Sequence, residues 1–133
     1  MKRSSKRAMD DDKVKTSRLL KEIPEIEDMS EVLEYTHHDD PAVRRKAVQQ
    51  LCPCRVKKDF DEFWKRTMEL AKDEDPVVRM QVLHNMCDGS PAHMEEQVAE
   101  ALDLFNNDPD KEIRRKAHKV MASYMRTGKW NIL

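Results

Sequence analysis

The chain has little of what strands, turns and membranes require. Its 133 residues include only 2 glycines, and aromatic side chains make up 5% of it. Strand-rich folds need more turn residues and more β-branched residues, so the composition predicts an all-α fold. No apolar run approaches the length of a membrane span, and the amino terminus lacks the apolar segment of a signal peptide.

Cysteine and net charge are low as well. Three cysteines cannot all pair within one chain, so the sequence does not predict a disulfide framework. We therefore expect a soluble protein of a reducing compartment, in the cytoplasm or the nucleus. The net charge of −1 argues neither for nucleic-acid binding nor against it. The length suits one domain with a modest core.

What the chain does have is one short motif in three copies, each with an apolar residue followed by an arginine. The arginines are Arg44, Arg79 and Arg114, spaced by 35 residues twice. The apolar positions keep the same period, as in Val43, Val78 and Ile113. A fixed period of this length predicts helix pairs that stack into a solenoid.

The repeats divide the chain. Apolar residues at helical spacing and Pro or Asp-Pro breaks predict repeats over 26–54, 58–89 and 92–126, within one domain of residues 13–133. Residues 1–12 are polar, and we expect a disordered lead-in there. A short helix over Val14–Ile23 is expected to cover the first repeat. The tail Trp130–Leu133 either covers the last repeat or docks on a partner.

The motif Asp-Pro-x-Val-Arg inside paired helices resembles the HEAT repeat, and the resemblance covers about residues 26–125. The resemblance implies an all-α, right-handed α-solenoid of three helix pairs with a short amino-terminal capping helix. It also implies a ladder of arginine–aspartate hydrogen bonds that stabilises the stack. The ladder residues would be Arg44, Arg79, Arg114, Asp73 and Asp108. His38 takes the aspartate position of the first repeat, where Asp39 or Asp40 is the alternative partner.

The resemblance further implies that binding uses the ridge formed by the second helix of each pair. The candidate binding residues lie on the helix face opposite the buried Ala47. The 35-residue period gives the equivalent positions in the other repeats, and their neighbours are included. They are Arg45, Lys46, Gln49, Met80, His84, Arg115, Lys116 and Lys119. The ridge is basic in the first and third repeats. We expect a monomeric interaction module that docks an acidic or extended segment of a protein partner. The alternative is a nucleic-acid-associated factor whose basic amino-terminal arm and ridge contact phosphates.

Catalytic and metal sites receive less support. Cys52, Cys54, His84 and Cys87 are candidate zinc ligands, because the period places Cys52 and Cys87 at equivalent points of adjacent helices. Cys-x-Cys is an unusual zinc spacing, however, and free cysteines are ordinary small hydrophobes, so we predict no metal and no cofactor. No Gly-rich phosphate loop or activated nucleophile is present. Glycosylases of a related fold need a carboxylate in a basic groove, and the predicted ridge has none. We therefore predict that the chain is not an enzyme, and a metal-dependent enzyme on this fold is the least favoured alternative.

Overall fold

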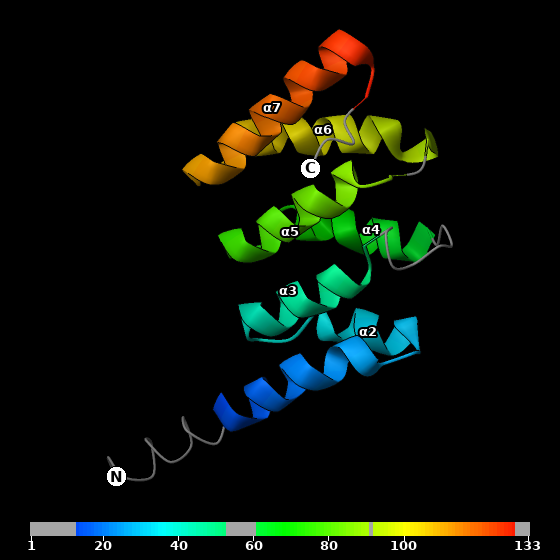
Figure 1. Ribbon diagram of the computed structural model, residues 1–133, viewed down its shortest axis with the longest axis vertical. Helices are drawn as coiled ribbons and strands as arrows, with labels where there is room; N and C mark the ends of the chain where they lie inside the picture. Colours follow the sequence, from blue (N-terminus) through cyan, green and yellow to red (C-terminus); the bar gives the residue numbers. More distant parts are fainter. Residues whose placement is uncertain (1–12, 53–60, 91, 130–133) are drawn as a thin grey trace.

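The computed structural model describes residues 13–52, 61–90 and 92–129, and these ranges contain helices and no strand (Figure 1). The predicted lead-in, Cys54 and the Trp130–Leu133 tail lie outside the described residues. Residues 13–22 are helical. The elements that follow are η1 (Ile23–Glu25), α2 (Met29–Tyr35), α3 (Pro41–Gln50), α4 (Asp61–Leu70), α5 (Pro76–Cys87), η2 (Ala92–Met94), α6 (Glu95–Asn106) and α7 (Lys111–Thr127).

The helices form pairs that are stacked along the long axis of the molecule (Figure 1). The pairs are α2 with α3, α4 with α5, and α6 with α7. Between pairs, α3 contacts α5 and α5 contacts α7, while α4 contacts α6. The second helices therefore form one layer and the first helices another, which is the arrangement of an α-solenoid.

Each second helix begins at an aspartate whose side chain accepts a backbone N–H of the first turn. Asp40 and Asp75 accept from the residue two places later, with Pro41 and Pro76 at the first helical position. Asp110 accepts instead from Ile113, three places later, and the proline of the third repeat precedes the cap, at Pro109. Such caps satisfy amide donors that have no partner within the helix.

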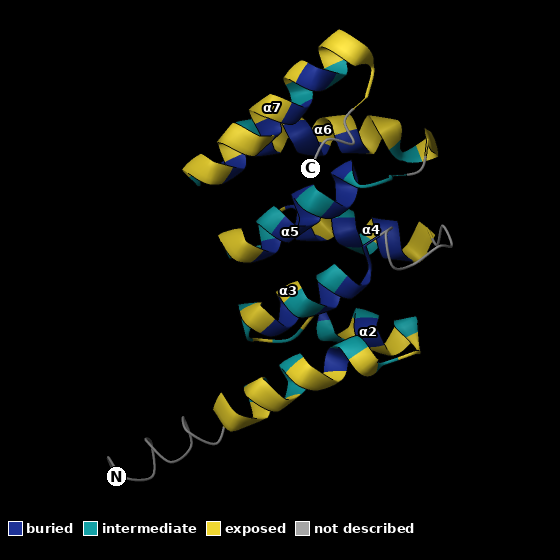
Figure 2. Ribbon diagram, viewed as in Figure 1, coloured by how far each residue is buried: buried dark blue, intermediate teal, exposed yellow. Residues whose placement is uncertain are grey.

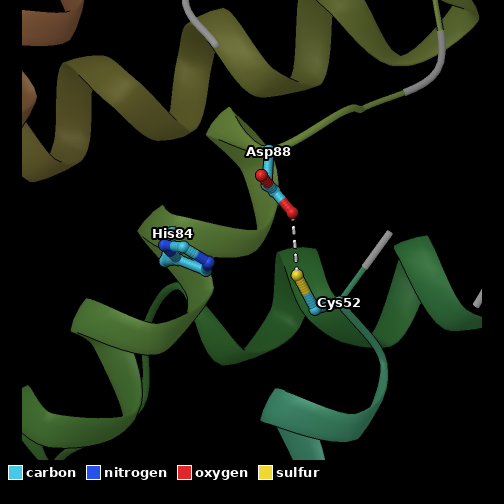
Figure 3. Close-up of side chains that lie close together, drawn as sticks. All are labelled: Cys52, His84 and Asp88. Atoms are coloured by element: carbon cyan, nitrogen blue, oxygen red, sulfur yellow. Dashed lines mark hydrogen bonds between the residues drawn. The ribbon is translucent and has the colours of Figure 1, made fainter. Parts of the chain in front are cut away.

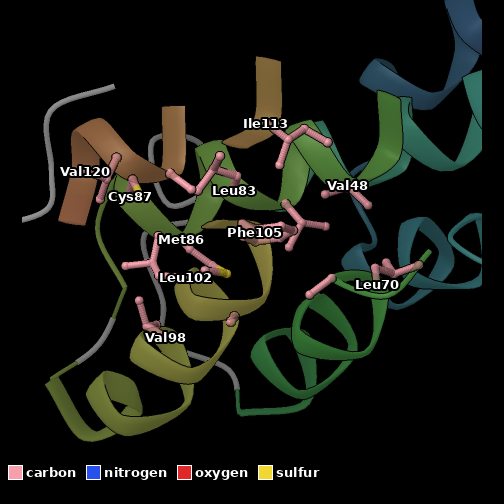
Figure 4. Close-up of a cluster of buried hydrophobic side chains, with 14 of the residues drawn as sticks. Val48, Leu70, Leu83, Met86, Cys87, Val98, Leu102, Phe105, Ile113 and Val120 are labelled. Carbon is pink, nitrogen blue, oxygen red and sulfur yellow. The ribbon is translucent and has the colours of Figure 1, made fainter. Parts of the chain in front are cut away.

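The core lies between the two layers (Figures 2 and 4). Its largest completely buried side chains include Phe105, Leu83, Met86 and Ile113, which come from α5, α6 and α7. At the amino-terminal end, Ile23 is completely buried and η1 contacts α3. This contact agrees with a cover over the first repeat, although the capping role of the helix over residues 13–22 stays a prediction.

A buried amide joins the first and second repeats. The Asn85 side chain in α5 donates from Nδ2 to the Val48 carbonyl oxygen of α3 at 2.8 Å. Its Oδ1 accepts from Nε2 of Gln81 at 3.0 Å, and both side chains are buried. Polar groups at such depth need partners. The bond to Val48 therefore links α3 to α5, and the bond from Gln81 satisfies the other end of the Asn85 amide.

Replacement of this amide has a defined expected cost. The Asn85→Ala variant removes the acceptor of the buried Gln81 amide, and we expect the free energy of unfolding to fall by about 1–3 kcal/mol. Urea denaturation followed by circular dichroism measures it. Asn107→Ala is the matched control, because the Asn107 side chain is exposed and its hydrogen bond, to the nearby Asp103 carbonyl, stays within one helix end. Equal losses for the two variants would show that the inter-repeat bond contributes nothing of its own.

Candidate functional site

Two arginine–aspartate pairs connect successive repeats. Arg44 donates from Nε and Nη2 to the two carboxylate oxygens of Asp73, at 3.0 and 3.1 Å. Arg79 donates in the same way to Asp108, at 2.9 and 3.0 Å, and in both pairs the partners are 29 residues apart. Each arginine therefore binds the aspartate of the following repeat. Two parallel bonds between a guanidinium and a carboxylate are the strongest arrangement open to this pair.

The third nitrogen of each guanidinium binds the turn of its own repeat. Nη1 of Arg44 donates to the carbonyl oxygens of His38 and Asp39, both at 2.9 Å, and Nη1 of Arg79 donates to that of Asp73 at 2.8 Å. The hydrogen bond with Asp73 raises the pKa of Arg44 above its ordinary value, although burial opposes the rise. These arginines are thus engaged inside the stack and offer little to a ligand.

The first and the third repeat each lack one partner of the arginine–aspartate ladder among the described residues. The expectation that Asp39 or Asp40 replaces the first ladder aspartate is wrong, because the carboxylate bound by Arg44 is that of Asp73. His38 instead accepts the Asp40 N–H at Nδ1, 3.0 Å away, as Asp73 and Asp108 accept the amide two residues on in their own turns. At the other end, Nη1 of Arg114 donates to the carbonyl oxygens of Asp108 and Pro109. No carboxylate among the described residues binds Arg114.

A groove of about 600 Å³ crosses the layer of second helices. Its centre is one face of α5, where Val77, Met80, Gln81 and His84 follow each other at helical spacing. Val77 is 47% exposed, so the groove has an apolar floor that solvent reaches. The α3 side contributes Arg45, and the α7 side contributes Asp110, Glu112 and Lys116.

A comparison with family models decides the family. The model described as HEAT repeats matches residues 26–122. The chain belongs to the HEAT-repeat family. HEAT repeats generally mediate protein–protein interactions, and they typically act as scaffolds without enzymatic activity. No curated protein and no solved structure matched the chain. Among the described helices of this HEAT-repeat protein, none is long and apolar enough to cross a membrane.

The groove of the HEAT-repeat protein uses half of the candidate binding residues. Arg45, Met80, His84 and Lys116 line it. The others do not: they are Lys46, Gln49, Arg115 and Lys119. Arg115 donates to Glu112 at 2.9 Å on the exposed surface of α7. On α7 the groove uses residues near the amino-terminal end, from Asp110 to Lys116, whereas the predicted ridge continues to Lys119.

Sequence reasoning missed two features of this groove. Val77 was not predicted, although Val77, Met80, Gln81 and His84 recur at i, i+3, i+4 and i+7 in the sequence, which marks a single helix face. The predicted ridge positions contain no carboxylate, but the groove includes two acids, Asp110 and Glu112, that the ridge prediction did not name. Both acids lie at the start of α7, where side chains cap the helix and complement its dipole.

Cys54 lies outside the described residues, and among the other three candidate zinc ligands Cys87 lies apart from Cys52 and His84. Cys87 is completely buried among core side chains (Figure 4). Burial raises the pKa of the Cys87 thiol to about 12, so it stays protonated at neutral pH, whereas a metal ligand must be a thiolate. Cys52 lies elsewhere, and its Sγ donates to Oδ2 of Asp88 at 3.1 Å, near His84 (Figure 3). Of the weak zinc candidates, Cys52 and His84 thus lie close together without Cys87, and the nearby Asp88 was not among the candidates.

Proposed function

We propose that this HEAT-repeat protein is an interaction module whose groove holds an extended segment of a partner protein. The observation that carries the proposal is the convergence of Arg45, Met80 and Lys116, from three successive second helices, on one groove. A segment that crosses the repeats would contact α3, α5 and α7 together, which is how solenoids use their long surfaces.

The groove has an apolar centre for an anchor side chain. Val77 and Met80 form this surface, and methionine adapts to partner side chains of different shape. Apolar and aromatic anchors in such pockets contribute most of the affinity in protein interfaces. We therefore expect the partner segment to place an apolar residue over Met80.

The two acids of the groove already accept hydrogen bonds, whereas its two cations form no ion pair with a described residue. Asp110 already accepts the Ile113 N–H at 3.0 Å, and Glu112 accepts from Arg115 at 2.9 Å. Neither Arg45 nor Lys116 forms an ion pair with any described residue. Acidic residues on both sides of the apolar anchor would complement these two cations, since complementary charge sets orientation and specificity. The proposed ligand is thus an extended segment with acidic residues on both sides of an apolar one.

The proposed ligand is tested by selection from a library of random displayed peptides, followed by calorimetry on the selected peptide. We expect the Lys116→Glu variant to lose about tenfold in affinity, which corresponds to about 1.4 kcal/mol. Lys119→Glu is the matched control, because it makes the same charge change on the same helix at an exposed residue outside the groove. It should leave the affinity nearly unchanged. A Met80→Glu variant replaces the apolar surface that receives the partner's anchor residue, and it should abolish binding.

The opposite outcome would favour a nucleic-acid partner. If no peptide is selected, and if Lys116→Glu and Lys119→Glu weaken binding to duplex DNA or RNA equally, the groove is not the binding site. Binding to phosphates also falls steeply with salt for every sequence tested, because bound counterions are released. That pattern would contradict the proposed docking of a protein segment.

A further inference from the structure

A cysteine, a histidine and an aspartate meet where the first repeat contacts the second (Figure 3). Cys52 follows α3, while His84 lies in the last turn of α5 and Asp88 is the residue that ends it. Their ligand atoms (the Cys52 Sγ, a His84 ring nitrogen and an Asp88 carboxylate oxygen) all lie within 4.8 Å of one another. His84 and Asp88 are four residues apart, so their side chains leave the same face of the chain.

These three groups match the chemistry of zinc. Thiolate, imidazole and carboxylate are its three protein ligands, with bonds of roughly 2.0–2.3 Å. Tetrahedral ligands at those bond lengths lie roughly 3.3–3.8 Å apart. Sulfur of Cys52 and oxygen of Asp88 are already 3.1 Å apart, and the remaining separations, at most 4.8 Å, would have to shorten on metal binding by rotation of the side chains. A mixed set with a thiol also favours zinc over the hard cations magnesium and calcium.

We propose that Cys52, His84 and Asp88 form a zinc site that links the first two repeats, with the fourth position left to water. Cys52 is 2% exposed, so its sulfur forms the closed side of the site, while the half-buried His84 and Asp88 form its entrance. On binding, a sulfur–zinc bond forms, the thiol bond to hydrogen breaks, and the proton passes to solvent. Asp88 then exchanges the thiol hydrogen bond for a bond to the metal.

The site has a structural consequence that does not depend on the proposed docking function. Cys52 belongs to the first repeat and the other two ligands to the second, so zinc would lock the α3–α5 contact that Asn85 also stabilises. A metal that binds only the folded chain raises its stability by mass action. His84 also lines the groove, so the metal would fix one wall of it.

Titration of the purified full chain with Co²⁺, followed by displacement with Zn²⁺, tests the site. We expect one bound metal per chain and a near-ultraviolet thiolate-to-cobalt absorption band, which zinc abolishes. Cys52→Ser should remove the band. His84→Gln and Asp88→Asn should each weaken binding by roughly a hundredfold or more, because loss of groups that merely support a metal ligand costs 10–100-fold.

The control is His93→Gln, since His93 also lies near a carboxylate, 2.9 Å from Asp61, but on the exposed surface outside the site. It should leave cobalt binding unchanged. Circular dichroism of each variant without metal checks whether the helices are intact. If Cys52→Ser is unstable, Asp88→Asn tests the site at a partly exposed position. Absence of a sulfur-to-metal band, or a band that survives Cys52→Ser and is lost in Cys54→Ser, would overturn the proposal.

Discussion

Replacement of Asp108 by alanine is expected to lower the free energy of unfolding by about 3–5 kcal/mol, the usual cost of removing one member of a buried ion pair. Asp108 is 6% exposed and accepts both bonds from Arg79, so its loss leaves a guanidinium without its carboxylate inside the stack. The Asp110 amide loses its acceptor as well. Urea denaturation followed by circular dichroism measures the effect.

The control for this variant is the exposed pair of Glu112 and Arg115. Its bond has a similar length, 2.9 Å, but both side chains are more than half exposed, so Glu112→Ala should cost less than about 1 kcal/mol. The double variant Arg79→Met with Asp108→Leu should recover part of the loss, since it leaves no unpaired charge. Similar losses for Asp108→Ala and Glu112→Ala would mean that the pair between repeats contributes no more than a surface pair.

Truncation of the core is expected to have an effect of comparable size. Phe105 in α6 is completely buried in the cluster formed by residues of α3 to α7. The Phe105→Ala variant loses the transfer free energy of the ring and leaves a cavity, at a cost of about 3–5 kcal/mol. Thermal and urea unfolding of the variant check this value.

The neighbouring Leu104 supplies the matched control. Its side chain is 48% exposed, so Leu104→Ala removes apolar surface that is largely in water already. We expect a change of about 0.5 kcal/mol or less, as for most surface substitutions. If Leu104→Ala destabilised the protein as much as Phe105→Ala, the assignment of the buried face of α6 would be incorrect.

The helix pairs could be predicted from the sequence because the 35-residue period fixes both the apolar faces and the start of each second helix. The arginine–aspartate residues could be named in the same way. Which repeat supplies the carboxylate could not, since spacing along the chain shows that Asp73 is close in sequence to Arg79, whereas stacking brings its carboxylate to Arg44. Which arginine meets which aspartate depends on how closely successive repeats stack in space.

The candidate site was only partly predictable, for a related reason. The period treats Cys52 and Cys87 as equivalent, but α3 ends at Gln50 while α5 continues to Cys87. Cys52 therefore lies in a turn and bonds to Asp88, while Cys87 remains on the helix and packs in the core. The groove also differs from the predicted ridge. Its residues on α5 follow the helix face that includes Val77, and they are not limited to the position equivalent to Arg45.

The measurement that tests the docking groove most directly is nuclear magnetic resonance mapping of the selected peptide on the isotopically labelled full chain. The account predicts that chemical shifts change for the amides and side chains of Arg45, Val77, Met80, His84 and Lys116, across three helices at once. Shifts confined to the outer faces of α2, α4 and α6, with these residues unchanged, would contradict it.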